Sequence, residues 1–399
     1  MEFNDKLSIV QKKAAESVGK TLDGGVYVVT GGTGFVGQRL VEMLVERGAD
    51  RVISFDIVPP TSLCWIHPKI EYVVGDITNK EQVIEACKGA DCVYHIAAAV
   101  GPFHPYPLYE RVNYQGTLHV IEACRVHNIP KLVMSSSPST RFDGSDVDGL
   151  TEAQMPALPL PRYMQTYAET KAMGEMAVTA ACSPSLMTVS VAPHQVYGPR
   201  DNLFMPNILE AAGTGVLRIF SARRTGYGMN KVCFTHVDNY CHGLMCAEKA
   251  LFKNSPALGK FYIVTDGRTH PSPLGYAHFW QVLDEPIKAM GFPSIWSKFK
   301  LPVWLLMPIA HICDFIGWLT GRKLKLNPFN VRVLTMHRWF DISVAERDLK
   351  FTPIISFTDG WRDTADYFKE HWLPRFRTNR RVAGLAQQSE DKINIQARR

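Results

Sequence analysis

The sequence has little of what marks a secreted, metal-binding or nucleic-acid-binding chain. Its nine cysteines include no C-x-x-C pair and no histidine–cysteine spacing typical of zinc, so we expect reduced thiols and no metal site. Residues 1–25 carry scattered charges and no apolar core segment, so no secretory signal is expected. The 44 Lys and Arg residues exceed the 38 Asp and Glu residues by only six, which does not predict a nucleic-acid partner.

Disorder is also excluded for the bulk of the chain, because 46% of its 399 residues are hydrophobic and only 21% are charged. That length suffices for one large α/β domain and a second lobe. Strands and helices alternate through the first part of the chain, which predicts a parallel, doubly wound sheet whose ligands bind beyond the carboxyl ends of the strands. The expected strands are Val26–Thr30, Arg51–Asp56, Glu71–Val74, Cys92–Ala97 and Lys131–Ser136, with helices at Lys80–Cys87 and Tyr109–His127.

A glycine-rich turn at residues 31–37 joins the first strand to the first helix. Gly31 and Gly32 permit a tight turn, and Gly34 lets the backbone approach a pyrophosphate. Gly37 lets the helix pack against the strand. Because the free amides of a helix N-terminus attract anions, this turn predicts a dinucleotide cradle.

Asp56 ends the second strand, at about the 20-residue interval where an acid binds the ribose hydroxyls of adenosine. An acid there repels a 2′-phosphate, so the sequence favours NAD over NADP. Arg39 and Arg51 leave NADP open, because either could reach a phosphate if Asp56 turned away; otherwise both are solvated charges.

Two more segments lie where a cofactor would bind. Asp76, followed by Ile77, could meet the adenine edge or could equally be a helix-capping turn residue. The small side chains of Ala97–Ala99 would let a cofactor lie close to the backbone. His95 lies in an apolar strand and is interpreted as a core histidine rather than a catalyst.

Tyr167 and Lys171 are four residues apart in a predicted helix and therefore share one helical face. A free tyrosine titrates at about pH 10, so Lys171 and the positive charge of a bound nicotinamide are expected to stabilise the phenolate. Ser137, after the fifth strand, would orient the substrate oxygen, with Ser139 as a second candidate. Tyr163 has no lysine four residues later and is the structural alternative.

These residues resemble the extended short-chain dehydrogenase/reductase family over about residues 24–372. The resemblance is carried by Thr30–Gly37, Asp76, Asn113, Ser137, Tyr167 and Lys171. It implies an α/β Rossmann fold, a doubly wound parallel sheet with a smaller C-terminal substrate-binding lobe. It also implies Ser137, Tyr167 and Lys171 as the catalytic group, supported structurally or as a proton relay by Asn113. The run Pro193–Asp201 is similar to the family's loop beside the nicotinamide.

The expected cofactor contacts all lie near one edge of the sheet. They are Gly31, Gly34, Phe35, Val36, Gly37, Asp56, Asp76, Ile77, Ala97, Ala98, Ala99, Tyr167, Lys171, Pro193 and Val196. The expected domains are a polar extension (1–23), a dinucleotide-binding domain (24–200 and 232–265), a substrate lobe (201–231 and 266–372) and a disordered polar tail (373–399).

Within this family the chain is most similar to the 3β-hydroxysteroid dehydrogenase/isomerases, and especially to sterol-4α-carboxylate 3-dehydrogenases (decarboxylating). The matching runs are Leu108–Thr117, Tyr167–Lys171, Tyr262–Gly267 and Asn327–Arg332. The resemblance implies NAD-dependent oxidation of a sterol 3β-hydroxyl group, with loss of CO2 from a 4α-carboxysterol. Phe142–Gly144 and Arg268–Ser272 depart from the pattern, which leaves the identity of the substrate open.

Several alternatives stay open at this point. The substrate carboxylate could meet Arg200, Arg223, Arg224 or Lys231. The activity could include a Δ5-isomerisation, or could be that of a nucleotide-sugar epimerase or dehydratase. A non-enzymatic NAD sensor or scaffold is the alternative from another class, which an intact Tyr167–Lys171 pair disfavours.

Leu301–Leu319 is a mostly apolar run of 19 residues, barely long enough to span a bilayer. Asp314 and two prolines favour an interfacial element instead, and flanking lysines and arginines with Trp304 and Trp318 suit a headgroup boundary. A buried helix of the second lobe is the alternative. We expect peripheral or monotopic attachment to the cytosolic face of the endoplasmic reticulum membrane, with a cytoplasmic location as the alternative. A homodimer and partner enzymes of a sterol demethylation complex are open possibilities.

Overall fold

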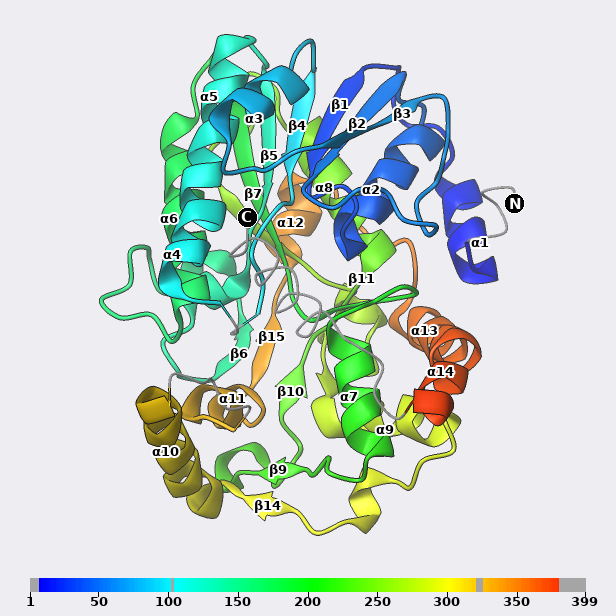
Figure 1. Cartoon of the computed structure of the whole chain (residues 1–399), viewed down its shortest axis with the longest axis vertical. Helices are drawn as coiled ribbons and strands as arrows, with labels where there is room; N and C mark the ends of the chain where they lie inside the picture. The colour runs from blue at the N-terminus through cyan, green and yellow to red at the C-terminus, as the bar shows by residue number, and fades with distance from the viewer. Residues whose placement is uncertain (1–6, 102–103, 321–325, 380–399) are drawn as a thin grey trace.

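The computed structural model describes residues 7–101, 104–320 and 326–379, which form an upper and a lower lobe (Figure 1). The upper lobe contains a seven-stranded parallel sheet in the order β3-β2-β1-β4-β5-β7-β12. Its strands are β1 Val26–Thr30, β2 Arg51–Asp56, β3 Ile70–Val74, β4 Cys92–His95, β5 Lys131–Ser135, β7 Met187–Pro193 and β12 Phe261–Val264. The predicted doubly wound sheet is confirmed, and its strand order reverses between β1 and β4, where dinucleotides bind in such folds.

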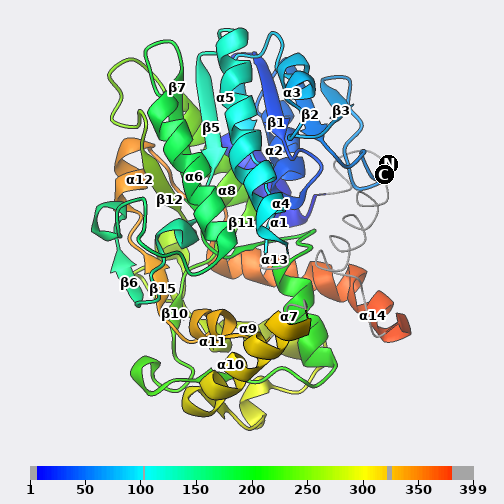
Figure 2. The ribbon, with the colours of Figure 1, turned by 60° about the vertical axis from the view of Figure 1, so that its left-hand side comes forward.

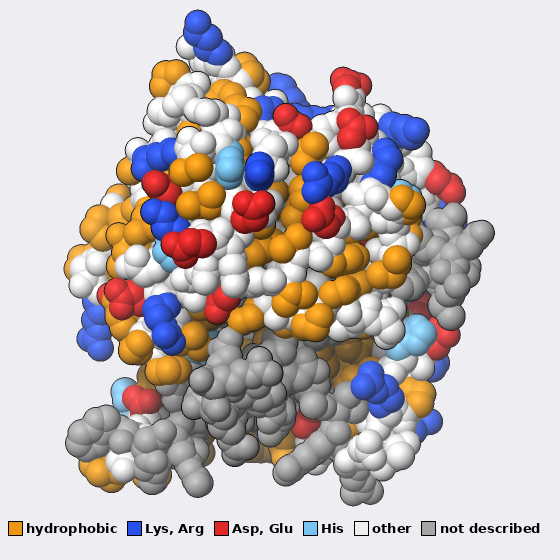
Figure 3. All heavy atoms as spheres, turned by 45° about the horizontal axis from the view of Figure 1, so that its top comes forward, with side chains coloured by type: hydrophobic (Ala, Val, Ile, Leu, Met, Phe, Trp, Pro, Cys, Tyr) orange, Lys and Arg blue, Asp and Glu red, His pale blue; other side chains and the backbone are white. Residues whose placement is uncertain are grey.

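Helices cover both faces of this sheet (Figure 2). One face carries α3 Lys80–Ala86, α5 Gly116–Val126 and α6 Thr166–Ala181, and the other carries α2 Phe35–Glu46 and α8 Val237–Lys249. Strands covered on both faces need continuous apolar runs, and β4 is buried at all four of its residues. On the face of the molecule drawn in Figure 3, acidic and basic side chains are interspersed.

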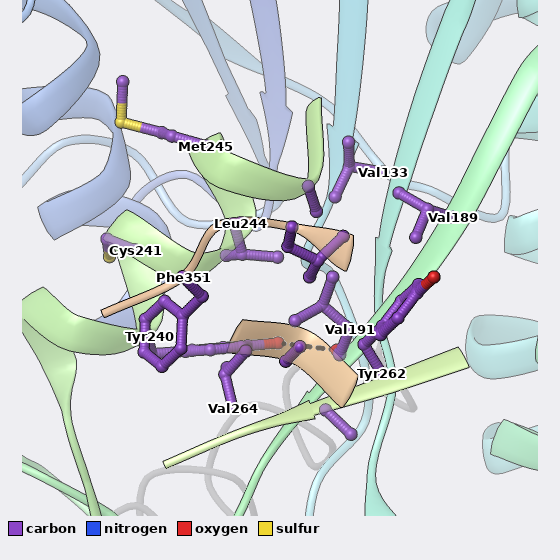
Figure 4. Close-up of a cluster of buried hydrophobic side chains, with 14 of the residues drawn as sticks. Val133, Val189, Val191, Tyr240, Cys241, Leu244, Met245, Tyr262, Val264 and Phe351 are labelled. Carbon is purple, nitrogen blue, oxygen red and sulfur yellow. Dashed lines mark hydrogen bonds between the residues drawn. The ribbon is translucent and has the colours of Figure 1, made fainter. Parts of the chain in front are cut away.

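Tyr240 of α8 fixes this helix beneath the sheet (Figure 4). Its ring packs with Val191 and Leu244 in the buried core. Its hydroxyl group lies 3.1 Å from the backbone oxygen of Val191 and 2.7 Å from the hydroxyl oxygen of Ser135. The polar end of a buried ring is thereby satisfied at the carboxyl ends of β5 and β7.

The lower lobe has a four-stranded sheet in the order β13-β10-β15-β6 and a separate aromatic core. These strands are β6 Val147–Leu150, β10 Lys231–Val232, β13 Ala277–His278 and β15 Arg338–Phe340. Two short ladders pair β8 Val196–Tyr197 with β11 Thr235–His236, and β9 Phe220–Ser221 with β14 Leu301–Pro302. The helices of this lobe are α7 Phe204–Gly213, α9 Phe279–Ala289, α10 Val303–Thr320, α11 Pro328–Val333, α13 Phe357–His371 and α14 Leu373–Asn379. Helix α12 Ser343–Asp348 follows β15 but packs against β12 in the upper lobe (Figure 1).

The described residues near both ends of the chain include helices. Within the polar extension, residues 9–18 form helix α1 (Ile9–Val18), and the Gln11 side chain donates to Asp238 at 2.7 Å. The prediction of a disordered tail from residue 373 is wrong for 373–379, because α14 buries Leu373 and Phe376. Residues 380–399 lie outside the described residues.

The helix predicted from Tyr109 to His127 is interrupted. It consists of α4 (Tyr106–Tyr109), a π-helical turn (Glu110–Gln115) and α5. The π-helical turn carries Asn113, and such turns often occur at functional sites.

Candidate active site

The glycine turn has the geometry that a dinucleotide cradle requires. Gly31 has φ +72°, and a side chain there would lie 2.9 Å from the backbone of Ala97. A side chain at Gly37 would collide with the backbone oxygen of Gly31, so α2 can pack against the turn only with glycine there.

The N-terminus of α2 leaves its first amides available. Its N-cap residue is Gly34, no described side chain caps it, and its first turn, which includes Phe35 and Val36, contains no acid. Uncapped amides at the positive end of a helix dipole form an anion site. The residues present therefore fit a pyrophosphate.

Asp56 lies at the carboxyl end of β2 beside this turn. Its two carboxylate oxygens accept the backbone N–H groups of Thr33 and Val58, each at 3.0 Å. Each carboxylate oxygen can accept more than one hydrogen bond, so both retain capacity for ribose hydroxyl groups.

Arg39 and Arg51 each pair with an acid, so neither is available to bind the 2′-phosphate of NADP, a possibility that the sequence left open. Arg39 is 1% exposed, and its guanidinium group donates to Asp238 at 2.9 Å and to Glu46 at 2.7 Å. Arg51 begins β2 and pairs with Glu71, at the opposite end of the strand from Asp56. Neither arginine supports NADP.

The remaining predicted cofactor contacts gather at the same edge of the sheet. Asp76 accepts the Thr78 backbone N–H at 2.8 Å and so is a turn residue, but the N-cap of α3 is Asn79. Ile77 is buried against Gly116. Ala97–Ala99 follow the end of β4 after Ile96. His95 is a core histidine, since its ring nitrogens lie 2.8 Å from Thr30 Oγ1 and 2.9 Å from Thr117 Oγ1.

The structure brings Ser137, Tyr167 and Lys171 together beyond the end of β5. The Ser137 hydroxyl interacts with Tyr167 and lies 2.8 Å from the hydroxyl oxygen of Ser139. Lys171 is buried, and its ammonium group donates to the backbone oxygen of Ser135 at 2.7 Å. Ser137 and Tyr167 are partly exposed, so a substrate hydroxyl can approach them.

Burial shifts the two ionisable groups of this site in opposite senses. It raises the pKa of Tyr167 to about 12, with a further contribution from Tyr109, while the Ser137 hydroxyl acts in the lowering direction. It lowers the pKa of Lys171 to about 8, which Glu175 partly counteracts. Both shifts follow from the cost of charge in a poorly solvated environment.

Asn113 joins the cofactor edge to the helix that carries Tyr167. Its side-chain oxygen accepts the Ala99 backbone N–H at 2.8 Å, and its amide group donates to Thr170 Oγ1 at 3.2 Å. It is 1% exposed. These two hydrogen bonds link the backbone that follows β4 to helix α6.

Arg200, the predicted substrate contact, is instead an internal ion pair. Its two terminal nitrogens each lie 2.7 Å from a carboxylate oxygen of Glu42. Arg224 pairs with Asp146, and Lys231 pairs with Asp148. The prediction that Arg200 meets the substrate is therefore wrong. The loop that contains it begins at Pro193, the last residue of β7, and continues through Val196 of β8.

Two neighbours of the site were missed in the sequence. The Tyr109 ring lies edge-on to Tyr167 with ring centroids 6.1 Å apart. Glu175, one further helical turn beyond Lys171, accepts Ser136 Oγ at 2.6 Å and pairs with Arg141 at 2.5 Å. Glu175 could have been predicted, because it lies four residues after Lys171 on the same face of α6. No feature of the sequence around Tyr109 predicts its contact with Tyr167.

A model of the 3-beta hydroxysteroid dehydrogenase/isomerase family matches residues 28–298. The chain is 33% identical to 3beta-hydroxysteroid-dehydrogenase/decarboxylase isoform 1 of Arabidopsis thaliana over 86% of this chain and 79% of that protein. It is 29% identical to human sterol-4-alpha-carboxylate 3-dehydrogenase, decarboxylating, over 86% of this chain and 87% of that protein.

The fold is shared with solved structures at lower identity. A UDP-glucuronic acid 4-epimerase from Bacillus cereus, solved with UDP-glucuronic acid and NAD, is similar with a TM-score of 0.63 and 21% identity. The alignment covers 87% of this chain and 100% of the epimerase.

Proposed function

Because this chain belongs to the 3-beta hydroxysteroid dehydrogenase/isomerase family, we propose that it oxidises the 3β-hydroxyl group of a 4α-carboxysterol with NAD. The observation that carries this proposal is the convergence of Ser137, Tyr167 and Lys171 beside a cradle that fits a pyrophosphate. The names of the similar plant and human proteins supply the sterol and the decarboxylation.

Each catalytic residue of this chain has its own part in the proton transfer. Tyr167, as the phenolate, takes the proton of the 3β-hydroxyl group, while Ser137 holds the oxygen in place. Lys171, whose ammonium group donates to the Ser135 backbone oxygen, favours the phenolate through its positive charge. NAD, when bound, accepts the hydride from C3.

Loss of CO2 then needs no separate base. Oxidation at C3 places a ketone β to the 4α-carboxylate, and a β-keto acid loses CO2 readily because the electrons of the breaking bond move into an enolate. Tyr167, protonated by the first step, is placed to donate to that enolate oxygen.

The proposal is tested by offering NAD and a panel of substrates to the purified protein. A 4α-carboxysterol should yield NADH and a 3-ketone that has lost CO2. A 3β-hydroxysteroid converted faster, with a Δ4-3-ketone as product, would identify a dehydrogenase/isomerase instead. Interconversion of UDP-sugars without net NADH would identify an epimerase, and NAD binding without any turnover would identify a sensor.

We further propose that helix α10 rests on a membrane surface at the cytosolic face of the endoplasmic reticulum, where sterols are dissolved. Ile312, Phe315 and Leu319 are each about 60% exposed, whereas Leu306 and Ala310 pack against Val331 of α11. Among the described residues no helix is long and apolar enough to cross a bilayer.

The surroundings of α10 suit an interfacial position. Trp304 is 77% exposed at its start, after Phe299 at 73% and two lysines, Lys298 and Lys300. Exposed apolar side chains next to lysines favour a headgroup boundary. The basic residues Arg322, Lys323 and Lys325, which follow the helix in sequence, lie outside the described residues.

Flotation with lipid vesicles tests this attachment. The double variant Ile312→Glu/Phe315→Glu should lose vesicle binding and keep its fold. Leu63→Glu/Ile66→Glu is the matched control, because these apolar side chains are also more than half exposed but lie on the upper lobe. Wild-type protein that does not float with vesicles would defeat the proposal.

A further inference from the structure

Arg338 of β15 is a buried cation that pairs with no anion among the described residues. It is 4% exposed, and no described carboxylate forms an ion pair with it. Its Nε–H group is buried and has no hydrogen-bond partner in the described part of the chain, while one terminal nitrogen lies 3.1 Å from Nε2 of His194. A guanidinium group buried without a carboxylate partner costs folding free energy, so we expect Arg338 to have a role beyond stability.

Other arginines of the protein interior differ in one of two respects. Arg39, Arg141 and Arg200 each pair with a carboxylate. Arg47 also has unpaired buried nitrogens, but it caps the C-terminus of α2, at the far end of that helix from the glycine turn. Arg338 alone among these combines a missing anion with a position near the candidate active site.

His194 connects Arg338 to the catalytic segment. It follows Pro193 at the carboxyl end of β7, the strand that pairs with β5 and accepts the Ser136 backbone N–H at Val191, 2.8 Å away. The His194 ring also packs edge-on against Phe142, which ends the turn that begins at Ser137.

The hydrogen bonds of His194 determine which edge of the Arg338 guanidinium group faces the histidine. Nδ1 of His194 donates to the backbone oxygen of Cys233 at 2.8 Å, so Nε2 is left as an acceptor for Arg338. A neutral histidine orients the guanidinium group but does not neutralise its positive charge. The Nε–H edge, which does not face His194, is left to meet an anion.

We propose that Arg338 is the residue that recognises the 4α-carboxylate of the substrate, an assignment that rests on the proposed function. A guanidinium group meets a carboxylate through paired N–H groups, and the Nε–H edge supplies such a pair. The 4α-carboxylate is attached to the carbon next to C3, so its partner has to lie within a few ångströms of Ser137 and Tyr167. Of the four candidates from the sequence, Arg200, Arg224 and Lys231 already pair with acids, and Arg223 is exposed. We therefore assign the carboxylate to Arg338 instead.

The test compares two sterols that differ only in the carboxylate. Values of kcat/KM are measured for a 4α-carboxysterol and for the methyl ester of its 4α-carboxyl group. The proteins compared are the wild type, Arg338→Met, Arg338→Lys and the control Arg332→Met. Arg332 is exposed on α11 in the same lobe and contacts the Gly144 backbone oxygen. We expect Arg338→Met to lower the acid-to-ester ratio at least 100-fold and Arg338→Lys to restore part of it, with Arg332→Met unchanged.

A merely structural role for Arg338 would lower activity on both sterols equally, and that result would overturn the proposal. A wild-type protein that does not distinguish the acid from the ester, in turnover or in competitive binding, would overturn it without any variant. Wild-type protein that binds the acid more tightly than the ester but reduces no NAD would refute the proposed function, and with it the assignment of Arg338 to an oxidation substrate.

Discussion

The Lys171 ammonium group lies 2.7 Å from the backbone oxygen of Ser135, the last residue of β5. The cation of the candidate site is thereby held at the edge of the sheet where Ser137 also lies. Because Lys171 is 2% exposed, water solvates its ammonium group poorly, and this burial lowers its pKa to about 8. The pair Tyr167 and Lys171 should therefore give the reaction a distinctive dependence on pH.

We expect kcat/KM for sterol oxidation to rise with pH between about 6 and 8. Burial raises the pKa of Tyr167 to about 12, so the fraction of phenolate rises about tenfold per pH unit in that range. Above about pH 8 Lys171 loses its proton, its stabilisation of the phenolate is lost, and the rise should level off. A rate that is constant from pH 6 to 9 would contradict these roles.

Asp56→Asn should weaken NAD binding and improve NADP binding. Asparagine keeps an acceptor for the Thr33 or Val58 backbone N–H group but removes the negative charge that holds the ribose hydroxyls and repels a 2′-phosphate. A hydrogen bond to a charged group contributes about 1.5–3 kcal/mol, so the Kd for NAD should rise at least about tenfold. Titration calorimetry with both cofactors measures this, and unchanged values for both would remove Asp56 from the cofactor site.

The sheet and the core of the site were predictable because their signals are local. The apolar runs that became β1, β2 and β5, the glycine turn and the four-residue spacing of Tyr167 and Lys171 can each be read within a few residues. Their meeting at one edge follows from the topology of a parallel sheet.

The partners of the charged residues could not be predicted in this way. Arg39 meets Asp238, which is 199 residues away, and Arg200 meets Glu42, which is 158 residues away. A sequence shows the arginine and not the acid that folding brings to it, so both arginines looked available for ligands. The same reason hid Arg338, whose significance lies in the absence of such an acid. The prediction of a disordered tail was wrong for a different reason. Helix α14 buries only two apolar side chains, which are too few to show a helical pattern in the sequence.

Arg39→Met should destabilise the fold without changing the choice between NAD and NADP. Removing one partner of a buried pair leaves Asp238 as an uncompensated buried charge, which costs about 3–5 kcal/mol. Chemical denaturation measures the loss. Arg51→Met is the control, because its ion pair with Glu71 is exposed and should contribute less than about 1 kcal/mol. A shift toward NADP in Arg39→Met would show that Arg39 meets the cofactor after all.

The most direct test of the account is the turnover of Tyr167→Phe with NAD and a 4α-carboxysterol, followed by NADH absorbance in a single-turnover experiment. Tyr163→Phe is the matched control, because the Tyr163 hydroxyl is bonded to the Leu160 backbone N–H and has no lysine one turn later. We predict that Tyr167→Phe binds NAD normally and oxidises the sterol about 10²–10⁴-fold more slowly, while Tyr163→Phe stays near the wild-type rate. Tyr167→Phe protein that forms NADH at the wild-type rate would contradict the assignment of Tyr167 as the base.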